Sequence, residues 1–311
     1  MEIFRTIESM PYYKDSIVTI GTFDGCHRGH QDIIKKVIYN AELRNTKSIL
    51  ITFDPHPRHI LQSDHKIPML MHIDRKLDFL NSFNLDTVLV IPFDKHFSNV
   101  SAYDFLNDII LKHLNPKKII VGHDHHFGHN REGSPEYLKN LSKDNRFDIE
   151  IVEPIKDGEM IISSTHIRDS IQKGFVRRAS FQLGWVFGFE AKVVAGSGRG
   201  KGLGFPTANF LPIEKNQLIP ANGVYFIRGR INSINLYGMC NLGFRPTFDE
   251  IDFVMEVHFF KGKVNDIYGK TITVEFLERV RDEKKFSSPK ELIKQLEKDK
   301  EICMRLIQKY N

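Results

Sequence analysis

The chain has 311 residues, about twice the length of a typical domain, so two domains are expected. Its 41% hydrophobic and 27% charged residues are typical of a globular protein and exclude a largely disordered chain. The net charge of +5 arises after residue 183, where most basic residues alternate with acidic ones, so we expect no nucleic-acid partner.

The sequence also indicates a compartment. No run of about eighteen apolar residues is present, and the N-terminus lacks the basic and apolar segments of a secretory signal, so no membrane association is expected. The three cysteines, Cys26, Cys240 and Cys303, are far apart and odd in number, which favours free thiols over a disulfide framework. We therefore expect a cytoplasmic protein.

The N-terminal half alternates between apolar runs typical of strands and amphipathic patterns typical of helices. The alternation predicts an α/β fold, in which a parallel sheet has helices on both faces. The expected strands are residues 16–23, 48–53, 87–93, 117–122 and 149–155, and the expected helices are residues 31–44, 74–83 and 102–114. Ligands bind such sheets beyond the carboxyl ends of the strands, so unusual residues that follow a strand are candidates for a site.

The segment GTFDGCHRGH, residues 21–30, follows the first expected strand and precedes the first expected helix. His27, His30 and the backbone amides of the helix start can point N–H groups at a phosphate chain. Gly29 allows the backbone to approach closely. A glycine-rich turn with incidental histidines is the alternative, but the position between strand and helix makes phosphate binding the better interpretation.

A second histidine-rich segment, residues 122–133, allows two interpretations. It offers imidazole and carboxylate ligands for a metal ion at His123, Asp124, His125, His126 and His129. Its glycines fit a nucleotide-binding loop instead, and side chains that alternate along a loop rarely converge on one ion. We therefore favour the nucleotide-binding loop.

Four segments of this half together resemble the HxGH nucleotidyltransferase superfamily, and within it the bacterial bifunctional riboflavin kinase/FAD synthetases. They are FDGCHRGH (23–30), TFDPHPR (52–58), VGHDHHFG (121–128) and SSTHIR (163–168). The resemblance implies a Rossmann-like domain in which the phosphate of FMN attacks the α-phosphorus of ATP and pyrophosphate leaves. The chain departs from the family pattern at His125 and His126, where aromatic residues are usual, and at His166, where a basic residue is common.

The resemblance also implies roles for particular residues. His27 and His30 would contact the ATP phosphates, and Arg168 would hold the β and γ phosphates together with Ser164 and Thr165 at another helix start. For the two hydroxyl residues alone, capping of the helix is the simpler explanation. Further ATP or flavin contacts are implied for Gly21, Phe23, Asp24, Gly29, Asp54, His56 and Asp124.

After residue 186 the pattern changes to short strands separated by Gly, Pro and Asn, which predicts a small antiparallel barrel. The expected strands are residues 189–196, 222–231, 236–243, 253–260 and 270–280. Residues 288–291 form a capping-box pattern before a final helix, whose apolar residues repeat near the helical period and should pack on the barrel. We expect two domains, residues 1–183 and residues 184–311.

Five glycines stand at alternate positions from Gly196 to Gly204, next to Arg199 and Lys201. Such a loop can wrap backbone amides around phosphates, although the glycines alone fit a flexible surface hairpin equally well. Six motifs in this half resemble the riboflavin kinase signature and favour the phosphate loop: GFPTAN (204–209), NGVYF (222–226), NLGFRPTF (241–248), MEVHFF (255–260), DIYG (266–269) and RDEKKF (281–286).

The riboflavin kinase resemblance implies a six-stranded barrel in which Thr207 and Asn209 hold Mg²⁺ with ATP, and Glu256 is the general base on the riboflavin 5′-hydroxyl. Alternation along the strand leaves the face of Glu256 open, and a solvent-facing glutamate is the alternative. Lys201 replaces an arginine that is common in the family, and Trp185 begins a segment where Arg-Pro is usual. ATP or flavin contacts are implied for Gly198, Arg199, Lys201, Gly204 and Arg281.

The two sets of motifs predict a bifunctional enzyme that phosphorylates riboflavin to FMN and adenylylates FMN to FAD. Mg²⁺ is the implied cofactor, and ATP, riboflavin, FMN and FAD are the implied substrates or products. One alternative is a chain that retains only one of the two activities, and another is a flavin-responsive binding protein on the same scaffold. The intact HRGH, PTAN and EVH residues argue against the binding protein, and no motif indicates an oligomeric state.

Overall fold

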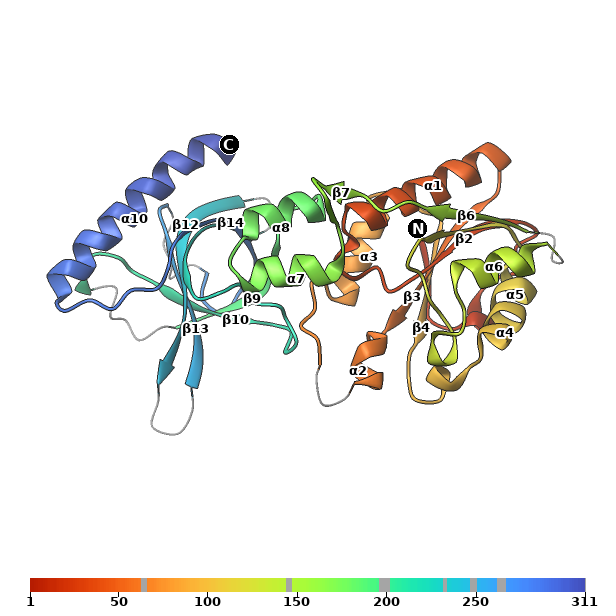
Figure 1. The fold of residues 1–311 in the computed structure, drawn as a ribbon. Coiled ribbons are helices and arrows are strands. Elements are labelled where there is room, and N and C mark those ends of the chain that lie inside the picture. Colours follow the sequence, from red (N-terminus) through yellow and green to blue (C-terminus); the bar gives the residue numbers. More distant parts are fainter. Residues whose placement is uncertain are drawn as a thin grey trace. The chain divides into compact units, whose positions relative to one another are not determined.

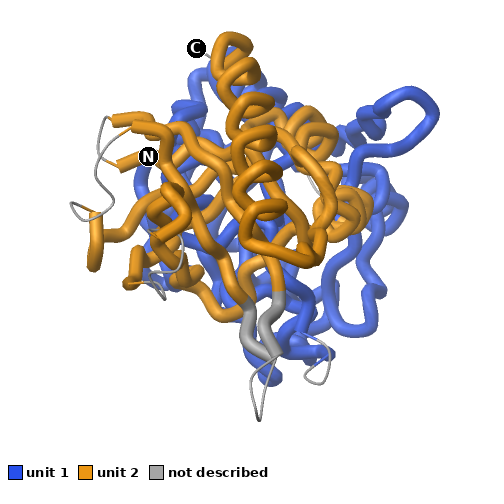
Figure 2. The backbone as a smooth tube through the Cα atoms, turned by 90° about the vertical axis from the view of Figure 1, so that its left-hand side faces the viewer, with its two compact units in different colours: residues 1–164 blue, residues 165–311 orange. Residues whose placement is uncertain are grey.

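The computed structural model of the protein describes residues 1–62, 66–143, 147–195, 202–231, 234–246, 251–261 and 267–310. The chain divides into two compact units, residues 1–164 and residues 165–311 (Figure 2). Helices α7 (Ser164–Gln172) and α8 (Val176–Leu183) thereby belong to the second unit, apart from the first residue of α7. We expected a domain boundary between residues 183 and 184. This division does not test whether a fragment that begins at residue 184 folds alone, so that boundary stays a prediction.

The first unit is a doubly wound α/β domain, which confirms the predicted fold (Figure 1). Its six parallel strands follow the order β1–β4–β3–β2–β5–β6. They are β1 (Glu2–Phe4), β2 (Ser16–Ile20), β3 (Lys47–Asp54), β4 (Thr87–Pro92), β5 (Pro116–Gly122) and β6 (Asp148–Val152). The order reverses at β2, and ligands bind beyond the carboxyl ends of the strands at such a point. The first histidine motif follows β2 directly.

Helices cover both faces of this sheet. α1 (Arg28–Arg44) packs on β2, β3 and β5. Apolar side chains of the strands form one core cluster with a helical layer on the opposite face, made of α4 (Ala102–Asp104), the π-helical η4 (Phe105–Leu111), α5 (Lys112–Leu114) and α6 (Pro135–Ser142). The shorter α2 (Pro57–Leu61) and α3 (Ile73–Asn81) follow β3, and the hairpin β7 (Lys156–Asp157) and β8 (Met160–Ile161) follows β6.

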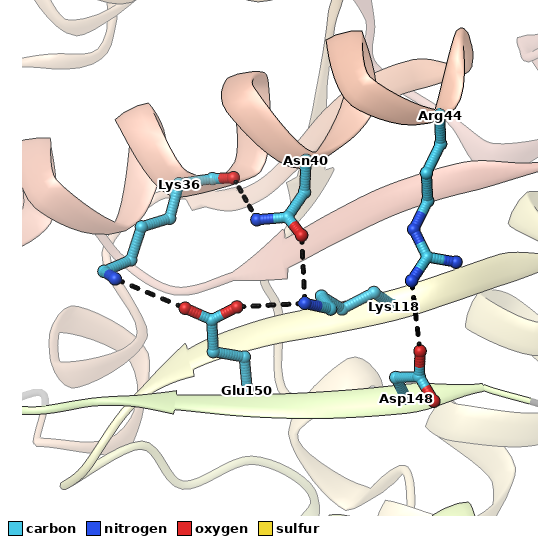
Figure 3. A network of polar contacts seen from close by, with 6 residues as sticks. All are labelled: Lys36, Asn40, Arg44, Lys118, Asp148 and Glu150. Atoms are coloured by element: carbon cyan, nitrogen blue, oxygen red, sulfur yellow. Dashed lines mark hydrogen bonds and ion pairs between the residues drawn. The ribbon is translucent and has the colours of Figure 1, made fainter.

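A polar network fastens the C-terminal half of α1 to the sheet (Figure 3). It joins three helix residues to three residues of β5 and β6: Lys36, Asn40, Arg44, Lys118, Asp148 and Glu150. Lys36 and Lys118 hold the two carboxylate oxygens of Glu150 at 3.3 and 3.1 Å. Burial raises the pKa of Glu150, but the hydrogen bonds from both lysines outweigh it and hold that pKa below its usual value. The network fixes the direction of a helix whose N-terminus carries the histidine motif.

The second unit contains a closed six-stranded antiparallel barrel, as predicted, with the strand order β10–β13–β12–β11–β14–β9 (Figure 1). The strands are β9 (Gly188–Val194), β10 (Ala208–Pro212), β11 (Gly223–Ile231), β12 (Ile234–Pro246), β13 (Ile251–Phe259) and β14 (Thr271–Arg281). Alternate strand residues are fully buried and fill the barrel, among them Val193, Phe210, Tyr225, Val257 and Phe276. In the described parts of the chain no helix is long and apolar enough to cross a membrane.

The final helix, α10 (Pro289–Tyr310), packs on the outside of the barrel as expected, with Cys303 of the helix buried against Val224, Phe226, Met239 and Leu277. Its start differs in one detail from the predicted capping box. Ser288 Oγ accepts the Glu291 amide at 3.3 Å, as the pattern requires. The carboxylate of Glu291 accepts in return from the amide and hydroxyl of Ser287, one residue earlier than expected.

Candidate active sites

The turn between β2 and α1 adopts a backbone conformation that most residues avoid. Three of its residues have φ angles between 39° and 75°, namely Phe23, Gly25 and Cys26. The surroundings hold this turn in place. Asp24 is 1% exposed, and its carboxylate accepts the Met71 amide at 3.2 Å, while its carbonyl accepts the Ser164 hydroxyl at 2.9 Å. Asp24 therefore shapes the turn, and its expected contact with a ligand stays a prediction.

His27 and His30 stack at the start of α1, with ring centroids 3.6 Å apart and ring planes 19° apart. His27 caps the helix, because its Nδ1 accepts the backbone amide of His30 at 3.4 Å. An accepting Nδ1 places the proton of a neutral ring on Nε2, so His27 can donate a hydrogen bond from that atom. A Cβ atom at Gly29 would lie 3.2 Å from the His27 ring, so glycine leaves room for the stack.

His30 is held uncharged. Burial, followed by the electrostatic influence of the neighbouring His27 and Lys76, keeps the pKa of His30 well below its usual value. Its Nδ1 is buried and has no hydrogen-bond partner among the described residues, and the edge of Phe23 packs against its ring at 5.2 Å. A buried ring nitrogen beside a helix N-terminus suits a contact with a bound ligand. The pair therefore offers ring N–H donors to an anion, and the His30 ring is uncharged.

Lys76 is a buried residue near this site that the sequence motifs did not indicate. Lys76, on α3, is 3% exposed, and its Nζ donates to the Thr22 carbonyl at 2.7 Å and to Thr52 Oγ1 at 3.4 Å. A signal was present in the helical pattern. Lys76 lies on the same helix face as the buried Leu77 and Leu80, and a lysine in an apolar stripe is seldom there for packing alone.

The second motif reaches the same edge of the sheet. β2 and β3 are parallel neighbours, so residues after their carboxyl ends lie close together. The Gly21 amide donates to the Ile51 carbonyl of β3 at 3.0 Å. Asp54 ends β3 and is joined to Pro55 by a cis peptide bond. His56 is nearly buried and caps α2, with its Nδ1 accepting the Arg58 amide at 3.1 Å.

The third motif does not form a metal site. The structure describes all five residues of that alternative, and it contains no group of three His, Cys, Asp or Glu residues placed to hold an ion anywhere in the described residues. The side chain of Asp124 is 79% exposed. His125 instead stacks on Phe127 at 5.6 Å, and burial lowers its pKa to about 4. A neutral, half-buried His125 therefore packs as an aromatic residue would at this position.

The fourth motif starts α7. The Ser164 hydroxyl does not cap the helix, because Ser164 is itself the first helical residue and donates to the Asp24 carbonyl. This bond holds Ser164, the last residue of the first unit, beside the first motif. Thr165 is exposed, and Arg168, one turn along the helix, is 8% exposed.

In the barrel, three polar residues form a row across neighbouring strands. Glu256 of β13 pairs with Asn209 of β10 on one side and with Asn241 of β12 on the other. Side chains of directly paired residues share a face and lie about 5 Å apart. The residues adjacent to the row point into the barrel and are 1% exposed or less, namely Ala208, Cys240 and Val257. The row therefore lies on the outer face, and Glu256 is half-buried there.

The row carries an unsatisfied polar atom. Asn209 Oδ1 is buried and accepts no hydrogen bond from any described residue, which suits an oxygen that binds a ligand or ion. Thr207 is half-buried two residues before it. Asn241 was not among the expected site residues, although it begins the NLGFRPTF motif. Only the pairing of β12 with β13 reveals its position beside Glu256.

His258 connects the PTAN segment to the strand of Glu256. Its Nδ1 lies 2.9 Å from the Pro206 carbonyl, so that nitrogen carries the ring proton and donates it. Burial lowers the pKa of His258, and its ring packs edge-on against Phe205 at 5.2 Å. Gly204 begins the motif with a φ of 81°, which favours glycine.

Arg281 makes contacts within the protein. Its Nε and Nη2 donate to the carboxylate of Asp299 at 2.8 to 3.0 Å, and Asp299 is fully buried in α10. The pair fastens α10 to β14, while the expected ligand contact of Arg281 stays a prediction. The remaining expected contacts of the glycine-rich loop lie outside the described residues, namely Gly198, Arg199 and Lys201.

Two family models match the chain, one for each half. The model described as FAD synthetase matches residues 9–166, and the model described as riboflavin kinase matches residues 183–307. Together they cover the four motifs of the N-terminal half, except the last two residues of SSTHIR, and nearly all of the barrel and its final helix.

Relatives match over almost the full length. A bifunctional riboflavin kinase/FMN adenylyltransferase of Buchnera aphidicola is 33% identical, over 100% of this chain and 98% of the relative. Proteins of the same name are 32% identical in Escherichia coli, over 96% of both chains, and 31% identical in Bacillus subtilis, over 93% and 92%. A crystal structure titled as a macrolide-efflux protein from Streptococcus pneumoniae has a TM-score of 0.88 at 30% identity, over 97% of this chain and 98% of that one.

Proposed function

The chain belongs to the family of bifunctional riboflavin kinase/FMN adenylyltransferases, and from this premise we propose which residues carry its two reactions. Its barrel domain phosphorylates riboflavin to FMN with ATP, and its α/β domain adenylylates FMN to FAD.

In the adenylylation, an oxygen of the FMN phosphate forms a bond to the α-phosphorus of ATP while the bond to the bridging oxygen breaks and pyrophosphate leaves. No protein nucleophile is needed, so the protein acts by positioning and by stabilising charge. His27 and His30 donate neutral hydrogen bonds to the phosphate oxygens from the N-terminus of α1. The observation that carries this role is the stacked pair, in which the buried His30 Nδ1 lacks a partner among the described residues.

Arg168, Ser164 and Thr165 hold the departing pyrophosphate in this proposal. Asp54, His56 and the 121–128 segment border the nucleotide or flavin. The support is the placement of Asp54 and His56 at the edge reached by residues 21–30, and the bond that holds Ser164 to Asp24. The roles of Thr165 and Arg168 rest on the family resemblance.

In the phosphorylation, Glu256 accepts the proton of the riboflavin 5′-hydroxyl as its oxygen bonds to the γ-phosphorus, and ADP leaves. Asn241 orients the Glu256 carboxylate from the neighbouring strand. The strand pairing that sets Asn209, Glu256 and Asn241 in one row supports both roles.

We propose Mg²⁺ as the cofactor of the kinase. The Thr207 hydroxyl and the Asn209 amide oxygen are hard oxygen ligands of the kind that Mg²⁺ prefers. The buried Asn209 Oδ1, without a partner in the described structure, fits such a ligand. Mg²⁺ bound with ATP would neutralise charge on the phosphates, and the protein residues hold the nucleotide in line with the hydroxyl.

The test is to measure FMN formation from riboflavin and FAD formation from FMN separately, each with Mg²⁺ and ATP. We expect both products. Formation of only one would replace the proposal with the single-activity alternative, and tight flavin binding with neither product would favour the flavin-responsive binding protein.

We also propose that the protein works in the cytoplasm on small molecules and without a nucleic-acid partner. Its three cysteines are buried free thiols, and burial raises the pKa of Cys26 and of Cys303 to about 12, so neither reacts readily. Cell fractionation tests the location, and recovery of the protein with membranes or in the medium would contradict it.

A further inference from the structure

Lys76 is a buried charge whose contacts do not include a carboxylate. Its two hydrogen bonds run to neutral oxygens, the Thr22 carbonyl at 2.7 Å and Thr52 Oγ1 at 3.4 Å. Within the described residues it forms no ion pair. Burial lowers the pKa of Lys76, and the charges of Asp24 and Asp54 offset this only in part. A buried amine without a carboxylate in contact is costly, so its presence in α3 calls for a function.

The geometry around Thr22 shows what this lysine does. The Thr22 carbonyl also accepts a hydrogen bond from Thr52 Oγ1 at 3.2 Å, and Thr52 is fully buried in β3. Lys76, Thr52 and the Thr22 carbonyl therefore form a closed triangle. It joins three segments that are distant in sequence: the turn after β2, the end of β3 and helix α3.

The peptide group held by this triangle lies in the turn next to a residue with an unusual backbone conformation. The peptide that follows Thr22 leads into Phe23, whose φ of 46° is disfavoured for a large side chain. Four residues later the chain reaches His27 and then the start of α1. If the Thr22 carbonyl rotated, Phe23 could relax to an ordinary backbone conformation, and the histidine pair would move with it.

We propose that Lys76 is a positioning residue of the adenylyltransferase, which locks the Thr22 carbonyl and thereby the turn that presents His27 and His30 to the substrate phosphates. The inference rests on the roles proposed for these two histidines. Lys76 also acts on His30 itself. Lys76 adds to burial and His27 in holding the pKa of His30 low, which keeps that ring neutral.

The test compares Lys76→Met and Lys76→Arg in the full-length protein. Because a misplacement of about 1 Å at a reacting group costs up to a hundredfold, Lys76→Met should lower kcat for FAD formation by about tenfold to a hundredfold. KM for ATP and FMN should change by less than about threefold, since substrate-contacting groups remain. Lys76→Arg, which can still donate to Thr22, should recover most of kcat.

A second variant tests the triangle without removing the charge. Thr52→Val keeps the shape of the side chain and deletes Oγ1, so it should lower kcat for FAD formation in the same direction but by less. Because Lys76 and Thr52 act on one carbonyl, the double variant should be little slower than Lys76→Met alone. Additive losses in the double variant would show that the two residues act separately and would overturn the triangle.

Leu80→Ala is the matched control, because Leu80 is fully buried on the same face of α3 and makes no polar side-chain contact. Folded Leu80→Ala protein should keep the wild-type kcat. A wild-type kcat in Lys76→Met, or an equal loss in Leu80→Ala, would overturn the inference. Riboflavin phosphorylation by each variant reports that the chain is folded. A wild-type protein that forms no FAD would instead refute the function of the domain, so the two failures are distinguishable.

Discussion

At the scale of single residues, the histidine pair is proposed to bind the substrate phosphates, with His30 uncharged. His30 lies in a buried position beside His27 and Lys76, where an added proton would be repelled, and its pKa is low for that reason. Neutral imidazoles can still donate from one ring nitrogen each, and the cap on His27 determines which nitrogen that is. The low pKa of His30 means that the protonation of this ring changes little near neutral pH.

His30→Ala should abolish most FAD formation from FMN and leave riboflavin phosphorylation intact, because the two reactions belong to different domains. Loss of one phosphate contact in the transition state costs about 3 kcal/mol, on the order of a hundredfold in rate. Separate assays of the two products measure the effect. The exposed His96 is the control, and His96→Ala should change neither rate. Normal FAD output from His30→Ala would remove the role proposed for this residue.

Glu256→Gln should depress riboflavin phosphorylation by about a hundredfold, because it keeps the shape of the side chain and removes the general base. The apparent affinity for ATP should change little, and FAD formation from supplied FMN should be unaffected. Glu190→Gln, at an exposed position on β9, is the control for loss of a carboxylate on the barrel. A near-normal kinase rate in Glu256→Gln would show that Glu256 is only a surface residue of the row.

At the scale of elements, each unit has a helix that polar side chains fasten to its sheet or barrel. The network of Lys36, Lys118 and Glu150 directs α1, and the Arg281–Asp299 pair joins α10 to β14. The two differ in burial. The first is partly exposed and contributes little to stability, whereas Asp299 is fully buried and its loss would leave a guanidinium without its partner.

Asp299→Ala should lower the free energy of unfolding of the barrel domain by about 3 to 5 kcal/mol, because it leaves the charge of Arg281 uncompensated. Denaturant unfolding monitored on the isolated C-terminal unit measures the change. Glu301→Ala is the matched control on the same helix, since the Glu301 side chain is 70% exposed and its contact with Arg305 is 3.9 Å long. Equal effects of the two substitutions would contradict the role given to the buried pair.

At the scale of the whole molecule, the boundary between the two functions can be tested with fragments. Residues 184–311 contain the complete barrel and α10, so we expect this fragment to fold and phosphorylate riboflavin. Helix α8 also packs on the barrel strand β14, and its Val176, Ala179 and Leu183 are fully buried. A fragment of residues 165–311 should therefore be more stable to heat than residues 184–311.

Thermal unfolding and kinase assays of both fragments measure these differences. An insoluble or inactive 184–311 fragment beside an active 165–311 fragment would move the functional boundary to the start of α7. Inactivity of both, with an active full-length kinase, would show that the barrel depends on the first unit.

The sequence by itself determined the two architectures and indicated most of the candidate site residues. Alternating strand and helix patterns predicted the parallel sheet, and short strands between Gly, Pro and Asn predicted the barrel, because periodicity along the chain follows directly from which face is buried. The motifs that resemble the two enzyme families indicated His27, His30, Asn209 and Glu256 as candidates, and their roles stay predictions.

Only the tertiary structure decided how those residues meet. Strand pairing set Glu256 between Asn209 and Asn241, and alternation along one strand could not reveal this, since both of its faces carry apolar residues. The fold also buried Lys76 beside the Thr22 carbonyl and paired Arg281 with Asp299. It did not bring the five residues of the possible metal site at 123–129 together around one position. Each of these outcomes depends on contacts between segments far apart in the chain, which local patterns of sequence do not encode.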